Sequence, residues 1–207
     1  MNWDSCVLWL EKAMQGSKWI DQSKYNNNGA MTGAAFKENA IEFDGVDDLV
    51  NCGQHSSLNI RDHISVEVLI KPYSLGVGNY GRIMEKVDSI YMFMATVNLV
   101  RFQLQDSGAN NHSILSDVGS IPFNEWTHVV GTYDGTTQKI YTNGVQCVDT
   151  DVWTNTIKDS AAVDLSVGNR AAGDRAFDGP ISLVRIYKSA LTAQQVKECF
   201  EQTYRKV

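Results

Sequence analysis

The sequence predicts an all-β sandwich with one short helix near its carboxyl-terminal end. Two observations carry this prediction: short alternating or apolar runs recur along the chain, and Gly, Asn and Asp lie between them as turn formers. Many short strands separated by such turns are typical of a sandwich or barrel. The 207 residues suffice for one substantial core, so we expect a single domain over residues 1–207.

The amino-terminal segment fits two structures. Residues 7–10 suit a short strand, whereas the spacing of Leu10 and Met14 also suits a helix; we favour a strand followed by a loop. Further runs with strand character then recur between turn signals. They lie at residues 40–43, 49–52, 64–70, 82–85, 90–95, 99–105 and 114–116.

The clearest strands form a meander that begins at Trp126. Every second residue from 126 to 132 belongs to one face, which is the period-two pattern of a half-buried strand. Asp134-Gly135 and Asn143-Gly144 can adopt the positive φ values that tight hairpin turns need. We therefore expect a hairpin to residues 138–142 and a third strand at residues 145–148.

The last part of the chain predicts two strands and the helix. The strands are expected at residues 162–167 and 179–187. Thr192 is placed to cap the helix, with Gln195 at the reciprocal capping-box position. Val196, Cys199 and Phe200 then space one apolar face, so we expect the helix to pack against the sandwich.

Composition restricts the class of partner. The net charge of −6 and the pI of about 5.2 repel nucleic-acid phosphates and anionic membrane surfaces. No apolar run is long enough to span a bilayer, and the first residues lack the pattern of a secretory signal. We expect neither nucleic-acid binding nor membrane insertion. The location stays open between cytoplasm, virion and the extracellular space after processing.

The four cysteines show no metal-site or redox spacing. Cys6, Cys52, Cys147 and Cys199 are far apart in the sequence, and none belongs to a C-x-x-C pair. We expect reduced, structural thiols. A Cys6–Cys199 disulfide is the alternative if the two chain ends lie side by side.

Eight segments follow one another in a specific order: VLWL, IDQSKYNNNGAMTGA, AIEFDGVDDLVNCG, SSLNI, ISVEVLIKP, WTHVVGTYDGTTQKIYTNGV, LSVGNR and FDGPISLVRIYKSALTAQQV. Together they resemble the laminin G-like jelly-roll group of the concanavalin A-like β-sandwiches. The resemblance implies two antiparallel sheets with the first and last strands as neighbours. The chain departs from the family pattern at Lys24, Leu49 and Leu69, where the family often has Gly, Tyr and Trp.

A cluster of carboxylates suggests a cation. Asp44, Asp47 and Asp48 lie close in sequence, and Asp178 occurs in a second Phe-Asp-Gly motif. Calcium prefers six to eight oxygen ligands, and the resemblance implies that a calcium ion is common in the family. These four aspartates are the candidate ligands of a structural Ca²⁺. The alternative is that they serve only as turn formers and caps.

Catalytic patterns are weak. Retaining glycosidases need two carboxylates about 5–5.5 Å apart, and no strand carries such a pair. Glu67 is the only acid in its strand, and Glu85 and Glu125 cannot be paired with it from sequence. His128 and Tyr133 fall on opposite faces of their strand, which argues against a lyase pair. We therefore favour a protein that is not an enzyme.

Recognition by loops remains. Sugar-binding sites combine an aromatic ring with polar groups on loops that a rigid scaffold holds. Trp153 has polar, turn-prone neighbours, so we expect it to be the best exposed aromatic. The candidate ligand-binding residues are Trp153, Tyr80, Asp106, Asn110, Asn111, Arg170 and Arg175.

The favoured function is a non-catalytic, lectin-like module that binds a carbohydrate or glycoprotein, with a structural calcium ion as its candidate cofactor. The carbohydrate class is implied by the family resemblance. Two alternatives are kept: a virion or cell-surface protein for assembly or attachment, and a polysaccharide-degrading enzyme of the same fold. A homo-oligomer is also left open.

Overall fold

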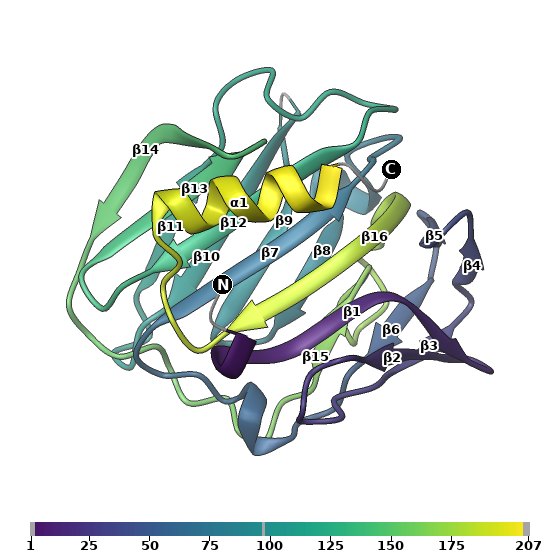
Figure 1. The fold of residues 1–207 in the computed structure, drawn as a ribbon, viewed down its shortest axis with the longest axis horizontal. Helices are drawn as coiled ribbons and strands as arrows, with labels where there is room; N and C mark the ends of the chain where they lie inside the picture. The colour runs from purple at the N-terminus through teal and green to yellow at the C-terminus, as the bar shows by residue number, and fades with distance from the viewer. Residues whose placement is uncertain (1–2, 97, 205–207) are drawn as a thin grey trace.

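The computed structural model describes residues 3–96 and 98–204 as two layers of antiparallel strands packed face to face (Figure 1). This confirms the predicted all-β sandwich. The strands are β1 (Cys6–Gln15), β2 (Lys18–Asp21), β3 (Gly29–Thr32), β4 (Ala35–Lys37), β5 (Ala40–Asp44), β6 (Leu49–Asn51), β7 (Ile64–Ile70), β8 (Arg82–Lys86), β9 (Ile90–Ala95), β10 (Leu99–Gln105), β11 (Asn111–Leu115), β12 (Thr127–Tyr133), β13 (Thr137–Thr142), β14 (Val145–Val152), β15 (Leu165–Val167) and β16 (Asp178–Tyr187).

One single-turn 3-10 helix precedes the first strand, two more lie between strands, and one α-helix follows the last strand. The 3-10 helices are η1 (Trp3–Ser5), η2 (Ser56–Leu58) and η3 (Val77–Asn79), and the α-helix is α1 (Ala193–Tyr204). In the described part of the chain, no helix is long and apolar enough to cross a bilayer.

The front layer in Figure 1 follows the order β1-β16-β7-β12-β13-β14. The back layer follows the order β11-β10-β9-β8-β15-β6-β3, and β2 pairs with both β1 and β3. Hydrogen bonding therefore passes from one layer to the other through β2 and β3. The first and last strands are neighbours, as expected: Leu8 lies opposite Ile186 and Leu10 opposite Val184.

The predicted meander is present as β12, β13 and β14, with Trp126 just before the first strand. The Asp134 carboxylate accepts the backbone N–H groups of Thr136 and Thr137, which fixes the first turn. Asn143 and Gly144 both have positive φ, 47° and 78°, as a tight hairpin turn requires. The turn chemistry of this segment thus sets the order of three adjacent strands.

The core lies between the layers and is built from alternate strand residues. In β7, Val66 and Val68 point into it, while Glu67 points to the outer face. Gly131 in β12 faces the ring of Phe102 from the back layer, and a Cβ atom there would lie 2.5 Å from that ring. A larger residue at position 131 would push the layers apart.

Helix α1 covers part of the outer face of the front layer (Figure 1). Its start has the predicted capping box: the backbone N–H of Thr192 donates to Gln195 Oε1 at 2.9 Å, and the N–H of Gln195 donates to Thr192 Oγ1 at 3.3 Å. The apolar residues between helix and sheet are Cys6, Val130, Tyr141, Tyr187, Leu191, Val196 and Cys199.

A network of buried charges lies on this same outer face. Arg185 in β16 contacts Glu67 in β7 through Nη1 at 3.2 Å, and its Nη2 donates to Glu11 in β1 at 2.8 Å. His128 Nε2 in β12 lies 3.1 Å from Glu67, and the Tyr187 hydroxyl donates to Glu67 at 2.8 Å. Glu67 is thus salt-bridged and fully buried.

The cysteines behave as the sequence predicts. Within the described residues all four are free and buried. Cys6 and Cys199 do lie in one cluster, which brings the two ends of the chain together, but no disulfide joins them. Burial raises the pKa of Cys6 to about 12, so this thiol is a packing group rather than a nucleophile.

The open edges of the two layers meet at β11 and β14. Asp149 of β14 accepts the backbone N–H of Leu115 at 2.9 Å, and Asp117 accepts the N–H of Val148 at 3.0 Å. Side-chain carboxylates thus occupy backbone donors that a further strand would use. Val148 itself remains 89% exposed.

The charged network predicts a dependence of stability on pH. Burial by itself would raise the pKa of Glu67, but the hydrogen bond from His128 and the charge of Arg185 outweigh it and lower the pKa to about 2, from an ordinary 4.5. Because the folded pKa is depressed, Glu67 stabilises the fold above about pH 4.5, and this contribution is lost as the pH falls towards 2.

We expect the free energy of unfolding in urea to decrease between these pH values, and the decrease to be smaller in Glu67→Gln. The carboxamide cannot ionise but keeps the shape and can still accept hydrogen bonds. Equal slopes in the two proteins would contradict the assignment to Glu67.

Candidate functional site

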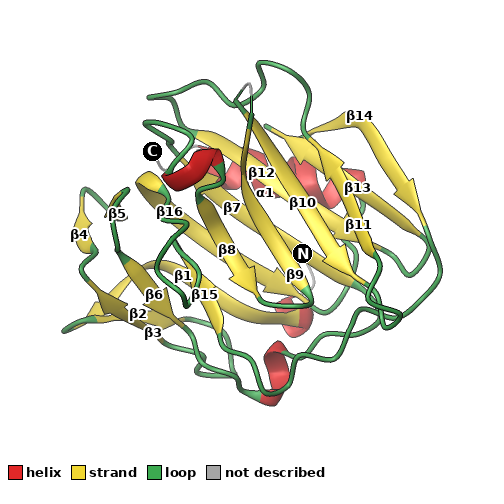
Figure 2. Ribbon diagram, turned by 180° about the vertical axis from the view of Figure 1, so that it is seen from behind, coloured by secondary structure: helices red, strands yellow, loops and turns green. Residues whose placement is uncertain are grey.

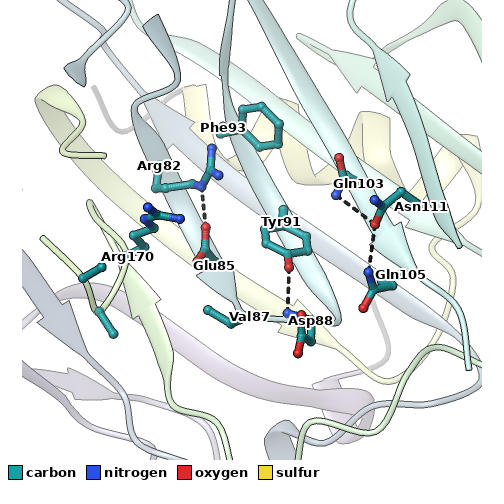
Figure 3. A pocket seen from close by; sticks show the side chains of 12 residues that line it. Arg82, Glu85, Val87, Asp88, Tyr91, Phe93, Gln103, Gln105, Asn111 and Arg170 are labelled. Atoms are coloured by element: carbon teal, nitrogen blue, oxygen red, sulfur yellow. Dashed lines mark hydrogen bonds and ion pairs between the residues drawn. The ribbon is translucent and has the colours of Figure 1, made fainter. Parts of the chain in front are cut away.

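The outer face of the back layer is the open face of the sandwich, because α1 lies on the other side (Figure 2). A groove of about 640 Å³ lies on this face over β8, β9, β10 and the start of β11, beside the loop after β15. Figure 3 shows its side chains. The groove is lined by Arg82, Glu85, Val87, Asp88, Tyr91, Phe93, Gln103, Gln105, Asn111, Arg170, Ala171 and Ala172.

Strand alternation explains why polar side chains reach this groove. Every second residue of β10 is buried in the core, and those between them, including Gln103 and Gln105, point outwards. In β9, Tyr91 and Phe93 point to the same face, and Tyr91 lies directly opposite Gln103. Two adjacent strands therefore place aromatic rings beside amide groups.

Three amides form a row along one wall of the groove (Figure 3). Gln103 Nε2 donates to Asn111 Oδ1 at 3.3 Å, and Gln105 Nε2 donates to the same oxygen at 3.1 Å. The ammonium group of Lys158 donates to the side-chain oxygen Oε1 of Gln105 at 3.0 Å. The side-chain nitrogen Nδ2 of Asn111 and the side-chain oxygen Oε1 of Gln103 have no partner among the described residues, so both can bind a ligand.

Arg82 forms the opposite wall and is held by three contacts. Its Nε pairs with the buried carboxylate of Glu85, and its Nη1 donates to the carbonyl of Tyr80 at 3.1 Å. The guanidinium lies 4.3 Å from the centre of the Phe93 ring, within cation–π range. Glu85 is 2% exposed and neutralised by Arg82, so it is not a free acid in the groove.

Two further groups complete the rim. Arg170 binds Asp174 through two hydrogen bonds, one of them 2.6 Å from Nη2 to Oδ2. This contact raises the pKa of Arg170 and lowers that of Asp174 to about 2. The Tyr91 hydroxyl accepts the backbone N–H of Asp88 at 2.7 Å, and burial raises the pKa of Tyr91. The rim is polar but electrically balanced.

The expectation that Trp153 is an exposed aromatic is wrong. Trp153 is 7% exposed and lies between two rings, with centroid distances of 3.9 Å to Tyr133 and 4.2 Å to His112. Its indole N–H donates to Gln138 at 3.3 Å. The polar neighbours that suggested exposure belong to the exposed end of β14, after which the ring turns into the core.

Asp106 also turns inwards, contrary to a role at an exposed loop, whereas Asn110 stays exposed and donates its side-chain amide to Asp106 at 3.0 Å. Asp106 is 2% exposed and accepts the backbone N–H of Asn110 at 2.8 Å and the side chain of Asn155 at 2.9 Å. Burial would raise the pKa of Asp106, but these amides and His112 lower it well below its usual range. The carboxylate thus holds the turn that carries Asn111 to the groove.

The structure brings together part of the predicted ligand-binding set. Arg170 and Asn111 line the groove, and Tyr80 packs against Phe93 at a centroid distance of 6.1 Å. Arg175 donates to the carbonyl of Asp174 at 3.1 Å beside the rim and does not line the groove.

Sequence reasoning missed Arg82, Tyr91, Gln103 and Gln105. The sequence analysis placed the candidate ligand-binding residues in loops, whereas these four residues lie on strands β8, β9 and β10. The signal was present in the alternation of residues 99–105, where polar side chains occupy every second position of a strand that was itself predicted. An outward polar row on a sheet face is the pattern that could have found them.

Three of the four predicted metal ligands lie close together. One carboxylate oxygen from each of Asp44, Asp47 and Asp48 lies within 4.8 Å of the others. Asp48 accepts the backbone N–H of Asp44 at 2.8 Å, and burial raises its pKa despite that hydrogen bond. Asp178 pairs with Asp44 through the backbone but is outside this group. The turn contacts leave other carboxylate oxygens available, so the donor set fits a cation that prefers oxygen.

Comparison with known proteins gives a family model and several solved structures. A model described as the concanavalin A-like lectin/glucanases superfamily matches residues 44–197. The binding domain of Paraclostridial Mosquitocidal Protein 1 superimposes with a TM-score of 0.78 at 17% identity, over 98% of this chain and 53% of that one. The ligand-binding domain of botulinum neurotoxin serotype D, in complex with N-acetylneuraminic acid, gives 0.76 at 17% identity, over 97% and 51%.

A third structure comes from botulinum neurotoxin type C, whose cell entry is described as dependent upon interaction with two ganglioside molecules; its TM-score is 0.74 at 16% identity, over 97% and 51%. The chain spans about half the length of these binding domains. At such identities the likeness concerns the fold. No curated protein matches the sequence.

The ring stack predicts that Trp153 supports the fold. Trp153→Ala removes the ring between Tyr133 and His112, and we expect a loss of about 3 kcal/mol or more in unfolding free energy, as for other buried aromatic truncations. Trp3→Ala is the matched control, because Trp3 is 40% exposed. Urea denaturation measures both. Equal losses of unfolding free energy in the two variants would contradict a stabilising role of the Trp153 ring stack.

Proposed function

The chain belongs to the concanavalin A-like lectin/glucanase superfamily, and on this premise we propose that it is a non-catalytic module that binds carbohydrate in the groove over β8–β11. The proposed partner is a glycan or the glycan of a glycoconjugate. Arg170 and Asn111 remain proposed ligand-binding residues, joined now by Tyr91 and Gln103.

The observation that carries the proposal is the amide row beside Tyr91 on the open face. Sugar hydroxyls both donate and accept hydrogen bonds. The side-chain N–H₂ of Asn111 offers a donor, and the side-chain oxygen of Gln103 offers an acceptor. An adjacent aromatic side chain can pack on the apolar face of a sugar ring. The strands hold these groups in fixed positions, so little ordering is needed on binding.

The state of the carboxylates supports binding rather than hydrolysis. Glycosidases need a pair of carboxyl groups that can reach the scissile bond, one of which is protonated. Glu85 is buried against Arg82, and Glu67 is sealed on the other layer with Arg185 and His128. Both are committed to ion pairs that maintain the sheet.

The solved structures support the ligand class. Structures with the same fold include a ligand-binding domain in complex with N-acetylneuraminic acid and one of botulinum neurotoxin type C, whose cell entry is described as dependent upon interaction with two ganglioside molecules. The proposal transfers only the class, a sugar or glycoconjugate, to this chain.

We expect Asn111→Ala to weaken glycan binding about tenfold, because one or two hydrogen bonds to the sugar are lost. Gln103→Ala should have a similar effect. Gln194→Ala on α1 is the control, since this exposed glutamine lies on the opposite side of the sandwich. A glycan array identifies the ligand, and titration calorimetry measures each variant. A glycan whose affinity is unchanged by both groove variants would contradict the site, and no bound glycan would contradict the function.

We propose in addition that Asp44, Asp47 and Asp48 bind a structural calcium ion. Their carboxylates converge, and a divalent cation would relieve the unfavourable burial of charge at Asp48. Asp178 was a fourth candidate from the sequence. It lies opposite Asp44 in the pairing of β16 with β5, so it would support the position of Asp44.

Calcium at about ten times its Kd should raise the melting temperature by about 3 °C, and a chelator should reverse the change. Asp47→Asn should abolish this increase in melting temperature, because the substitution removes one carboxylate ligand. Asp47 is exposed, so the substitution should have little effect on packing. Asp62→Asn is the control at an exposed site outside the cluster. Calorimetric scans measure the shift, and the same response in wild type and Asp47→Asn would refute this site.

A further inference from the structure

A second cavity, of about 470 Å³, lies on the front layer, which is the opposite layer from the groove. It is formed where β5 joins the beginning of β16 and where β7 ends and β12 begins. Its volume suits a ligand of one or two sugar rings. The cavity is lined by Lys37, Glu38, Asn39, Ala40, Glu42, Lys71, Tyr73, Trp126 and Pro180.

Strand pairing determines which side chains enter this cavity. Ile41 and Phe43 of β5 are buried in the core, so Glu42 between them points to the outer face. Glu42 lies opposite Pro180 of β16, whose next residue pairs with the end of β7. Trp126 precedes the first residue of β12, which pairs with Ile70. Residues distant in sequence therefore meet on one surface.

The β4–β5 turn lies at the edge of this surface. Lys37 pairs with Ala40, so Glu38 and Asn39 form a two-residue hairpin turn, and both have the positive φ that such a turn requires, 48° and 66°. The Ser182 hydroxyl donates to the carbonyl of Asn39 at 3.1 Å and ties the turn to β16. The turn thereby places Lys37, the last residue of β4, beside the cavity.

Two aromatic rings face the cavity without being part of the core. Trp126 is half-buried, and Tyr73 is 39% exposed. Burial and the neighbouring carboxylate of Glu42 raise the pKa of Tyr73, so these two side chains lie together at the cavity. Trp126 lines the cavity just before β12 begins.

Two cations remain available. Lys37 and Lys71 both line the cavity, and among the described residues neither ammonium group has a carboxylate partner or a hydrogen-bond acceptor. Most other charged groups at the molecule's binding surfaces, such as Arg82 and Arg170, are already paired. Unpaired lysines beside an aromatic ring can hold an anionic group while the ring packs against the rest of the ligand.

From these observations we infer that this cavity is a second, separate binding site, for a saccharide that carries a carboxylate. Lys37 and Lys71 bind the carboxylate, and Trp126 packs against the apolar face of the sugar ring. The Tyr73–Glu42 pair forms the far wall, where the Glu42 carboxylate can accept a sugar hydroxyl. Glu38 and Glu42 also line the cavity, but among the described residues neither forms a salt bridge with Lys37 or Lys71, whereas the groove cations Arg82 and Arg170 are bound to Glu85 and Asp174.

The test is a titration followed by NMR through the indole N–H of Trp126, which Trp126→Phe assigns. N-acetylneuraminic acid and glucuronic acid are the probes, and galactose is the neutral comparison. We expect saturable shifts of the Trp126 signal with at least one acidic sugar and an affinity for galactose at least tenfold weaker. Lys71→Gln should reduce the affinity for the acidic sugar about tenfold, since it removes one charge-assisted contact.

Two variants act as controls. Lys18→Gln removes the same charge from an exposed position at the start of β2 and should leave the affinity unchanged. Asn111→Ala disables the groove but not this cavity, so the Trp126 shifts should persist in it whether or not the proposed groove binds a glycan.

Three outcomes would overturn the inference: no saturable shift at Trp126 with either acidic sugar, equal affinities for galactose and the acidic sugars, or an affinity that Lys71→Gln does not change. Inorganic sulfate is included as a further probe. If it shifts the Trp126 signal with the same affinity as the acidic sugars, the cavity binds anions in general and the saccharide assignment fails.

Discussion

The buried ion pair between Glu67 and Arg185 is the interaction around which the front layer is organised. It joins β7 to β16, extends through Glu11 to β1, and is completed by His128 from β12. Buried charges are costly to desolvate, and the loss of one partner would leave the other without compensation. Four strands and the position of α1 above them are thereby tied to one arrangement, and the other layer is left as the open face.

The open face depends on a second, uncharged device. Tyr133 of the front layer, Trp153 after β14 and His112 of the back layer form one stack across the sandwich. His112 follows Asn111, and Asp106 accepts the backbone N–H of Asn110 on its other side. The stack and this hydrogen bond therefore fix the position of Asn111 in the amide row. Trp153, which the sequence suggested as a ligand-binding aromatic, instead packs between the rings of Tyr133 and His112 and supports the face that carries the amide row.

The sequence predicted the architecture well because strand alternation and turn chemistry are local. The meander from Thr127, the capping box at Thr192 and the pairing of first and last strands are all present. The candidate site was predicted less well. Exposure of Trp153 depends on how the chain turns after β14, and the partners of Glu67 come from two other strands, β12 and β16. Neither is encoded in neighbouring residues, whereas the outward row at Gln103 and Gln105 was readable and was overlooked.

The seam between β11 and β14 has a consequence for behaviour at high concentration. Strand β14 exposes three apolar side chains, Val145, Val148 and Val152, which on an unprotected edge would favour pairing with further strands and aggregation. Asp117 and Asp149 occupy backbone donors at that edge, and an incoming strand would have to expel both carboxylates. These two aspartates act as gatekeeper residues, which allow β14 to expose apolar side chains without promoting aggregation of the protein.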